Sequence, residues 1–246
     1  MFKGAVTFQA RIKGNGRRFP SFEFSPNVSG VDTVEIEAPD GEEIRTTVYL
    51  VGVVSSDAGR EIATKVNMAT LNRICFNYDI VFEGVRCKGS SFSPLDPQPG
   101  VISIEALEMA FALEEVKVVS DIPPSLLKAE LEKASPPGEQ NYGLFRSALQ
   151  STSPVEEFMH LYHIFLMIRG DDQKLVETFI ISEDPAVPQT KDPREWKDQM
   201  ETVYTRLRNE FAHRRAGVNL ETTKSEMAER IGGLRALVKR AIELDP

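Results

Sequence analysis

Apolar and polar residues alternate along several segments in the first half of the chain, with the two-residue period of a strand that buries one face. The clearest case has Val6, Phe8, Ala10 and Ile12 separated by polar or small residues, and a Gly-Asn-Gly turn follows it. We therefore predict a strand at this position. The same reasoning predicts further strands over residues 31–37, 44–54, 79–87 and 101–119.

A helical period interrupts these strands over residues 57–76. Ile62, Val66 and Ala69 recur on one side of the projected helix, and Ser55 or Ser56 stands where an N-cap is expected. A sheet covered by one helix is the simplest arrangement of these elements. We therefore predict an α+β domain over residues 1–120.

Proline pairs mark the next segment as a connector. Pro123-Pro124 and Pro136-Pro137 enclose a short charged stretch, and prolines at both ends stiffen a linker. We predict a proline-rich linker over residues 121–140.

The rest of the chain has a helical period. Ser153 and Glu156 form a capping box with Pro154 at the first helical position, which predicts a helix that ends before Gly170. The pattern indicates an all-α bundle over residues 141–246. Its predicted helices cover residues 141–150, 154–169, 171–182, 194–215 and 222–244, with a loop at 183–193.

The composition and charge of the chain limit the classes of protein to which it can belong, and they leave the predicted fold unchanged. The 246 residues suffice for one large or two small domains, and the net charge of −8 argues against a protein that coats nucleic acid non-specifically. The two cysteines have no zinc-ligand spacing, and no secretion signal is visible. The most apolar run, residues 158–168, is much shorter than the roughly 20 residues of a membrane span. A cytoplasmic protein without a membrane partner is expected.

The most specific chemistry lies in ten residues near the C-terminus, 206–215, which hold four arginines and one of the three histidines. Arginine neutralises phosphate, and histidine transfers protons near neutral pH. Cleavage of RNA without a metal ion needs both. The candidate residues are Arg208, Asn209 and His213 for catalysis, and Arg206, Arg214 and Arg215 for binding the RNA backbone.

On the predicted helix 194–215, successive residues are about 100° apart. Asn209 and His213 are four residues apart, so they are stacked neighbours. They are expected on the side away from the core, together with Asp198, Thr202 and Thr205. The expected core-facing stripe comprises Trp196, Met200, Val203, Tyr204, Leu207 and Phe211.

Simpler explanations exist for these residues. Arginines in a last helical turn are favoured by the helix dipole even without a function, and His213 would then be a solvated surface residue. His160 and His163 have no Asp, Glu or Cys beside them in a metal-binding pattern and are expected to be core or interface residues. No metal and no cofactor are expected.

The segment Arg208-Asn209-Glu210-Phe211-Ala212-His213 resembles the Arg-x(4–6)-His motif of the HEPN superfamily, in its common Arg-Asn form. The predicted setting is similar, with the motif in a late helix followed by one more. The resemblance covers about residues 140–246 and implies a helical domain that forms a homodimer with two motifs facing one cleft. Many HEPN proteins are metal-independent endoribonucleases of toxin–antitoxin, phage-defence or RNA-processing systems.

The resemblance also implies roles for the matching residues. His213 would be the general base or acid, and Arg208 would stabilise charge on the phosphorane. Asn209 would orient the imidazole or hold a phosphate oxygen. RNA is the expected substrate, and an antitoxin or regulatory protein is an expected partner.

Two other functions remain open. One is a non-catalytic HEPN-like module whose arginines bind a nucleotide, RNA or a phosphorylated partner. The other is a protein-interaction module whose helical bundle is an assembly surface. A fold-level resemblance alone does not decide between these functions.

Overall fold

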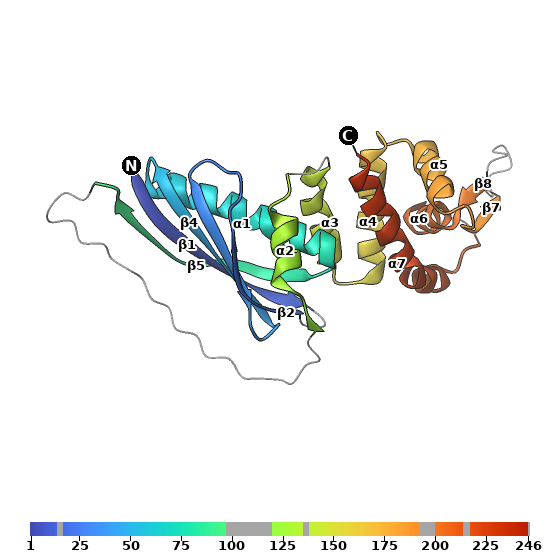
Figure 1. Ribbon diagram of the computed structural model, residues 1–246. Coiled ribbons are helices and arrows are strands. Elements are labelled where there is room, and N and C mark those ends of the chain that lie inside the picture. Colours follow the sequence, from blue (N-terminus) through green and yellow to red (C-terminus); the bar gives the residue numbers. More distant parts are fainter. Residues whose placement is uncertain (14–16, 97–119, 135–137, 192–199, 214–216, 246) are drawn as a thin grey trace. The chain divides into compact units, whose positions relative to one another are not determined.

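The chain folds into two compact units, Met1–Ser135 and Pro136–Pro246, which are described separately (Figure 1). Together they make a mixed α/β protein with an antiparallel sheet and, in the described part of the chain, seven α-helices. The computed structural model describes residues 1–13, 17–96, 120–134, 138–191, 200–213 and 217–245.

Unit 1 is built on a six-stranded sheet with the order β5-β1-β4-β3-β2-β6. All its strand pairs are antiparallel except β2 with β6. Four predicted strands are confirmed, whereas β2 and β6 were not predicted, and the turn expected at 14–16 and the strand expected at 101–119 lie outside the described residues. The strands are β1 (Phe2–Lys13), β2 (Arg17–Phe24), β3 (Val31–Ala38), β4 (Glu43–Val53), β5 (Val81–Pro94) and β6 (Ser120–Asp121).

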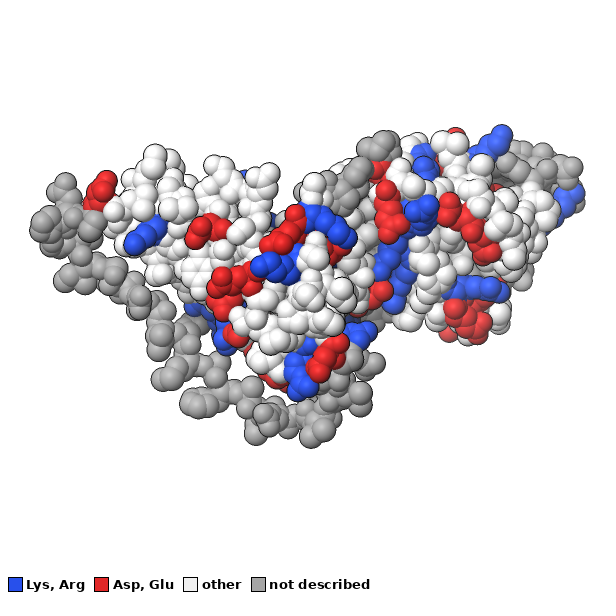
Figure 2. All heavy atoms as spheres, viewed as in Figure 1, with Lys and Arg blue, Asp and Glu red and all other residues white. Residues whose placement is uncertain are grey.

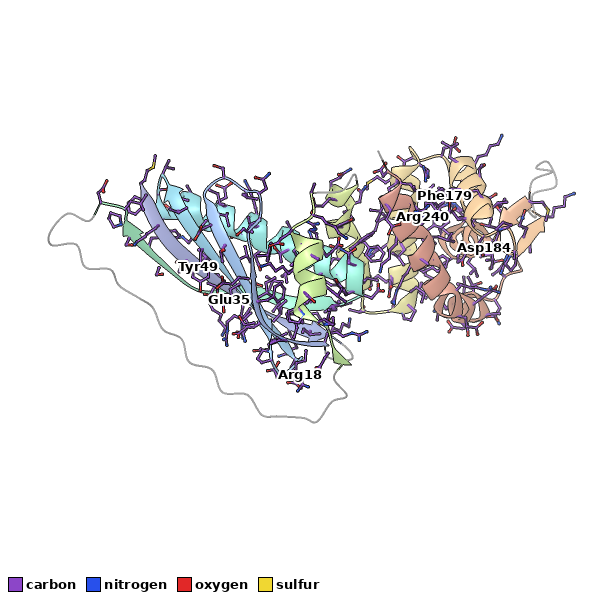
Figure 3. All side chains as sticks on the ribbon, in the orientation of Figure 1. Arg18, Glu35, Tyr49, Phe179, Asp184 and Arg240 are labelled. Atoms are coloured by element: carbon purple, nitrogen blue, oxygen red, sulfur yellow. The ribbon has the colours of Figure 1, made fainter. Side chains whose placement is uncertain are left out.

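The alternation in the sequence divides the sheet into an apolar and a polar face. Val6, Phe8, Ala10 and Ile12 are all buried. The opposite face carries polar cross-strand contacts, such as the Tyr49 hydroxyl that donates to Glu35 at 3.0 Å (Figure 3). The core of unit 1 therefore lies on one side of the sheet.

Helix α1 (Ser56–Tyr78) packs on the apolar side of the sheet and buries Ala63, Leu71 and Ile74. Its N-terminus is capped as predicted, since the Ser55 hydroxyl accepts from the Ala58 amide at 3.1 Å. Helix and sheet together form the expected α+β arrangement.

The predicted connector belongs in large part to unit 1. Strand β6 pairs with β2, and helix α2 (Pro124–Leu131) follows it. The buried guanidinium of Arg73, on α1, donates to three carbonyls at the end of α2. The acceptors are Glu130 O at 2.7 Å, Leu131 O at 3.2 Å and Lys133 O at 3.2 Å. The linker prediction was wrong here because these long-range contacts leave no local signal.

Unit 2 contains a single 3-10 turn (Glu139–Asn141) and five α-helices in its described part. The Ser153 hydroxyl caps α4 by accepting from the Glu156 amide at 3.2 Å, as the capping box predicts. Glu157 of α4 forms a two-pronged ion pair with Arg235 of α7. The helices are α3 (Tyr142–Leu149), α4 (Pro154–Ile168), α5 (Gln173–Glu183), α6 (Val203–His213) and α7 (Leu220–Glu243).

Unit 2 also holds a two-stranded hairpin that the sequence did not predict. Strand β7 (Gln189–Lys191) pairs antiparallel with β8 (Met200–Thr202), and the part of the chain between them lies outside the described residues. Within the part of the chain that the structure describes, none of the helices combines the length and the apolar character needed to cross a membrane.

Candidate functional site

Helix α6 carries the Arg-Asn-His residues, and it begins later than predicted. A helix over residues 194–215 was expected, but residues 200–202 form β8 and the helix starts at Val203. The Val203 amide donates to Pro188 O at 2.8 Å, and the Thr202 hydroxyl accepts from the Thr205 amide at 3.4 Å. Pairing with β7 and this threonine cap therefore fix the start of α6.

The expected outward face of this helix is buried. Asn209 is 2% exposed, and Thr202 and Thr205 are not exposed at all, whereas Met200, expected in the core, is 51% exposed. The reason is that α6 contacts α7 on one side and α4 and β8 on others. Its C-terminal end, with Ala212 and His213, is exposed to solvent. Trp196 and Asp198 lie outside the described residues.

Arg208 and His213 meet at this open end of α6. Nη1 of Arg208 lies 3.3 Å from Nε2 of His213. A guanidinium can only donate, so the contact is a hydrogen bond when the imidazole is neutral and carries its proton on Nδ1. In that form the ring is a proton acceptor held beside a permanent positive charge.

Asn209 forms its hydrogen bond with Arg208 and not with His213. Its Oδ1 accepts from Arg208 Nη1 at 2.8 Å, and its Nδ2 donates to Oε1 of Glu201 at 3.0 Å. No hydrogen bond joins Asn209 to His213 within the described residues, although the helical spacing suggested one. Glu201, which is 2% exposed, was not among the predicted site residues.

A buried hydroxyl network lies behind Arg208. The Tyr162 ring of α4 lies 5.9 Å from the Arg208 guanidinium carbon, within the range of a cation–π contact. The Tyr162 hydroxyl is 2.8 Å from the hydroxyl of Thr205. Burial raises the pKa of Tyr162 to about 12, and the carboxylates of Glu177 and Glu201 contribute to the rise. The phenol therefore stays neutral at physiological pH.

Glu177, on α5, is a second acid near this network and is partly buried. Its Oε1 accepts from the Thr202 amide at 2.9 Å. Burial raises the pKa of Glu177, and the charge of Glu201 raises it further, while hydrogen bonds from Thr205 and Thr202 oppose the rise. The two carboxylates come from separate elements, α5 and β8, and no sequence spacing relates them.

Arg206, an expected RNA-binding residue, forms two ion pairs within unit 2. Its guanidinium donates to Glu210 at 2.9 Å and to Glu226 of α7 at 2.7 Å, and its side chain is 21% exposed. Two carboxylates therefore neutralise it. Arg208, by contrast, forms no ion pair with any residue that the structure describes. Arg214 and Arg215 lie outside the described residues.

His160 and His163 are exposed on α4, and Nδ1 of His160 lies 3.1 Å from the Ser151 hydroxyl. Across the described segments, no three His, Cys, Asp or Glu side chains are grouped to hold a metal ion. The expectation of core histidines was wrong, because α4 buries only its other face, and a place in an interface stays a prediction.

Acidic and basic side chains are interspersed on the face of the protein in Figure 2, in which Lys and Arg are blue.

Comparison of the chain with models of protein families, with characterised proteins and with solved structures finds no match.

Proposed function

We propose that unit 2 is a metal-independent endoribonuclease of the HEPN type, with Arg208 and His213 as its catalytic residues. The observation that supports this most directly is the 3.3 Å contact between Arg208 Nη1 and His213 Nε2 at the solvent-exposed end of α6. A phosphate-binding cation and a proton-transfer group lie side by side there. Asn209, buried beneath them, holds the arginine in place.

In the proposed reaction the 2′-oxygen of a ribose attacks the adjacent phosphorus, and the bond from phosphorus to the 5′-oxygen breaks. The phosphate draws the Arg208 hydrogen away from His213, which frees the Nε2 lone pair to accept the 2′-hydroxyl proton. Arg208 stabilises the charge on the phosphorane. A second proton donor protonates the 5′-oxygen, and the products are a 2′,3′-cyclic phosphate and a 5′-hydroxyl.

The second proton donor would be the His213 of another copy of the chain. A dimer that faces two α6 ends across one cleft supplies one imidazole as base and one imidazolium as acid. It also doubles the positive charge that an acidic chain presents to RNA. Sedimentation of the purified protein should give a mass near twice 27.5 kDa.

The test is incubation with mixed cellular RNA in excess EDTA. Wild type should leave 5′-hydroxyl ends, and His213→Ala should lower the rate by about 10²–10⁴-fold. Arg208→Ala should lower it by about 10²–10³-fold, as loss of a charge-stabilising donor does. Matched controls are His160→Ala and Arg240→Ala. Arg240 lies on α7 (Figure 3), and it pairs with Glu183 at 3.4 Å. Both controls should cleave like wild type.

Cleavage that survives both Arg208→Ala and His213→Ala would refute this assignment. Absence of cleavage by wild type would favour the non-catalytic binding module instead. That module predicts an affinity for phosphate-bearing ligands that Arg208→Ala removes and His213→Ala leaves intact. The contact of Arg208 with neutral His213 is compatible with it, since the guanidinium binds phosphate without proton transfer.

A further inference from the structure

We infer that Glu201 is a positioning residue, which fixes the orientation of the Asn209 amide and thereby holds Arg208 beside His213. This inference rests on the proposed function for its catalytic consequence, but its structural content can be measured without any activity. The chain of contacts runs from Glu201 Oε1 to Asn209 Nδ2 at 3.0 Å, and from Asn209 Oδ1 to Arg208 Nη1 at 2.8 Å.

The direction of these two hydrogen bonds follows from which side-chain groups can donate a hydrogen and which can only accept one. An ionised carboxylate only accepts, an amide has one donating and one accepting end, and a guanidinium only donates. Asn209 stands between Glu201 and Arg208, so its NH₂ must face Glu201 and its oxygen must face Arg208. If the amide rotated by half a turn, each end would meet a group of its own kind.

Burial makes this preference strong. Glu201 and Asn209 are each 2% exposed, so water cannot replace a lost partner. A buried polar group without a partner is costly, and a buried charge is more costly still. Arg208 is only partly buried and His213 is exposed, so the network is most constrained at Glu201 and progressively less so toward the open end.

The position of Glu201 in the fold suits this role. It lies on β8, which is fixed by pairing with β7, and Asn209 lies two turns into α6. The carboxylate therefore belongs to an element other than the helix that carries the motif. It acts on the reaction through Asn209 and Arg208 and does not itself reach the open end of α6.

An exchange of the amide and the acid tests the inference. In Asn209→Asp, the new carboxylate faces Glu201 with no hydrogen between them, and the two negative charges repel. In the double variant Glu201→Gln with Asn209→Asp, the introduced amide NH₂ donates to one oxygen of the introduced carboxylate, whose other oxygen accepts from Arg208. The hydrogen bond between positions 201 and 209 is then restored, with its direction reversed. All the side chains keep their size.

Two readouts are needed. The first is cleavage of RNA in EDTA, where Asn209→Asp should lose about ten- to a hundredfold in kcat, as loss of a supporting contact does. The double variant should recover only part of this loss, because the carboxylate that then contacts Arg208 also neutralises its charge. Glu201→Gln alone, which keeps an accepting oxygen but not the charge, should lose less than Asn209→Asp does. The second is NMR relaxation of the Arg208 Nε–H group, which should be rigid in wild type and in the double variant and mobile in Asn209→Asp.

The outcomes separate this inference from the proposed function. If wild type does not cleave RNA, the proposed function fails, while the NMR pattern still decides whether Glu201 positions Arg208. If wild type cleaves RNA but the double variant is no better than Asn209→Asp in both readouts, the inference fails and the nuclease stands. A merely structural role of Glu201 predicts that the two substitutions add, so that the double variant is worse than either.

Discussion

Two carboxylates with different roles, the buried Glu201 and the partly buried Glu177, lie near the start of α6. Glu201 accepts from Asn209 and so belongs to the network that ends at His213. Glu177 accepts from the Thr202 amide and thereby holds the start of α6. Because burial and the nearby charge of Glu201 raise the pKa of Glu177, ionisation of this residue opposes folding to some extent.

This gives a prediction for the dependence of stability on pH. The pKa of Glu177 is raised in the folded protein, so the folded state binds the proton more tightly than the unfolded state does. The free energy of unfolding should therefore fall as pH rises from the unfolded-state value, about 4.3, through the raised pKa, and level off above it. Glu177→Gln should remove this part of the dependence. Urea unfolding of both proteins between about pH 4.5 and 7.5 measures the difference.

A difference between wild type and Glu177→Gln that stays constant with pH would contradict the assignment. Thr202 keeps an acceptor in the variant, because the glutamine oxygen replaces the carboxylate oxygen.

At the residue scale, the sequence identified the groups that we propose to react but not the groups that hold them. The Arg-to-His spacing and the helical period predict correctly that Arg208 and His213 share one end of a helix. The burial of Asn209 was not predictable, because it results from β8 and α4 packing against the side that the helical projection leaves open. Glu201 precedes Asn209 by eight residues but lies in a strand, so no helical spacing reveals it.

At the scale of elements, the hairpin of β7 and β8 is the largest departure from expectation. Thr202 is β-branched, which weakly favours a strand, but Met200 and Glu201 fit a helix equally well. The pairing with Gln189–Lys191 decides the structure, and it comes from outside the local window. The starts of the two helices capped by Ser55 and Ser153 were predicted closely, because each capping residue lies next to its helix in the sequence.

Helix α7 contains two adjacent glycines whose roles differ. A side chain at Gly233 would meet the Tyr204 hydroxyl of α6 at 2.3 Å, whereas one at Gly232 would meet nothing within 4 Å. Gly233 therefore permits the close approach of α7 to α6, and Gly232 has no such packing reason within the described residues. Both cost helix stability relative to alanine.

The two glycines provide a matched pair of variants. Gly232→Ala should raise the free energy of unfolding by about 0.5–1 kcal/mol through helix propensity and a less flexible unfolded chain. Gly233→Ala should lower it by about 1–3 kcal/mol, because Tyr204 must shift within a packed interface. Chemical denaturation of the two variants beside wild type gives both values. Equal effects of the two substitutions would show that the approach of α7 to α6 does not depend on Gly233.

At the scale of the whole molecule, the chain separates into two units that each bury their own core. The change from alternating to helical period predicted two halves, but not that residues 121–134 are part of the first. Proline content indicated a connector, and the contacts of α2 with Arg73 come from residues 57–60 positions away. Such contacts require the folded sheet and helix α1, so local composition does not reveal them.

Substitution of Arg73 tests whether the two units are stable independently of each other. Arg73→Met keeps the apolar stem but removes the donors to three carbonyls, so unit 1 should lose about 3 kcal/mol of stability. Hydrogen exchange should show faster exchange in α1, α2 and the six-stranded sheet and unchanged protection of α4 and α7. The control is Lys65→Met on the same helix, where the side chain is 74% exposed. Faster exchange in α4 and α7 would show that the two units depend on each other for stability.

The dependence of α2 on Arg73 also bears on the order in which the chain folds during synthesis. A helix of eight residues has little stability by itself, and α2 is eight residues long. Strand β6 pairs with a strand about a hundred residues earlier, and the Arg18–Asp121 contact spans 103 positions. We therefore expect the sheet and α1 to form first, and β6 and α2 to join them last, when the ribosome has released nearly all of unit 1. Until then the β2 edge of the sheet lacks the strand that pairs with it. We expect a chain truncated before residue 120 to expose that edge to other proteins.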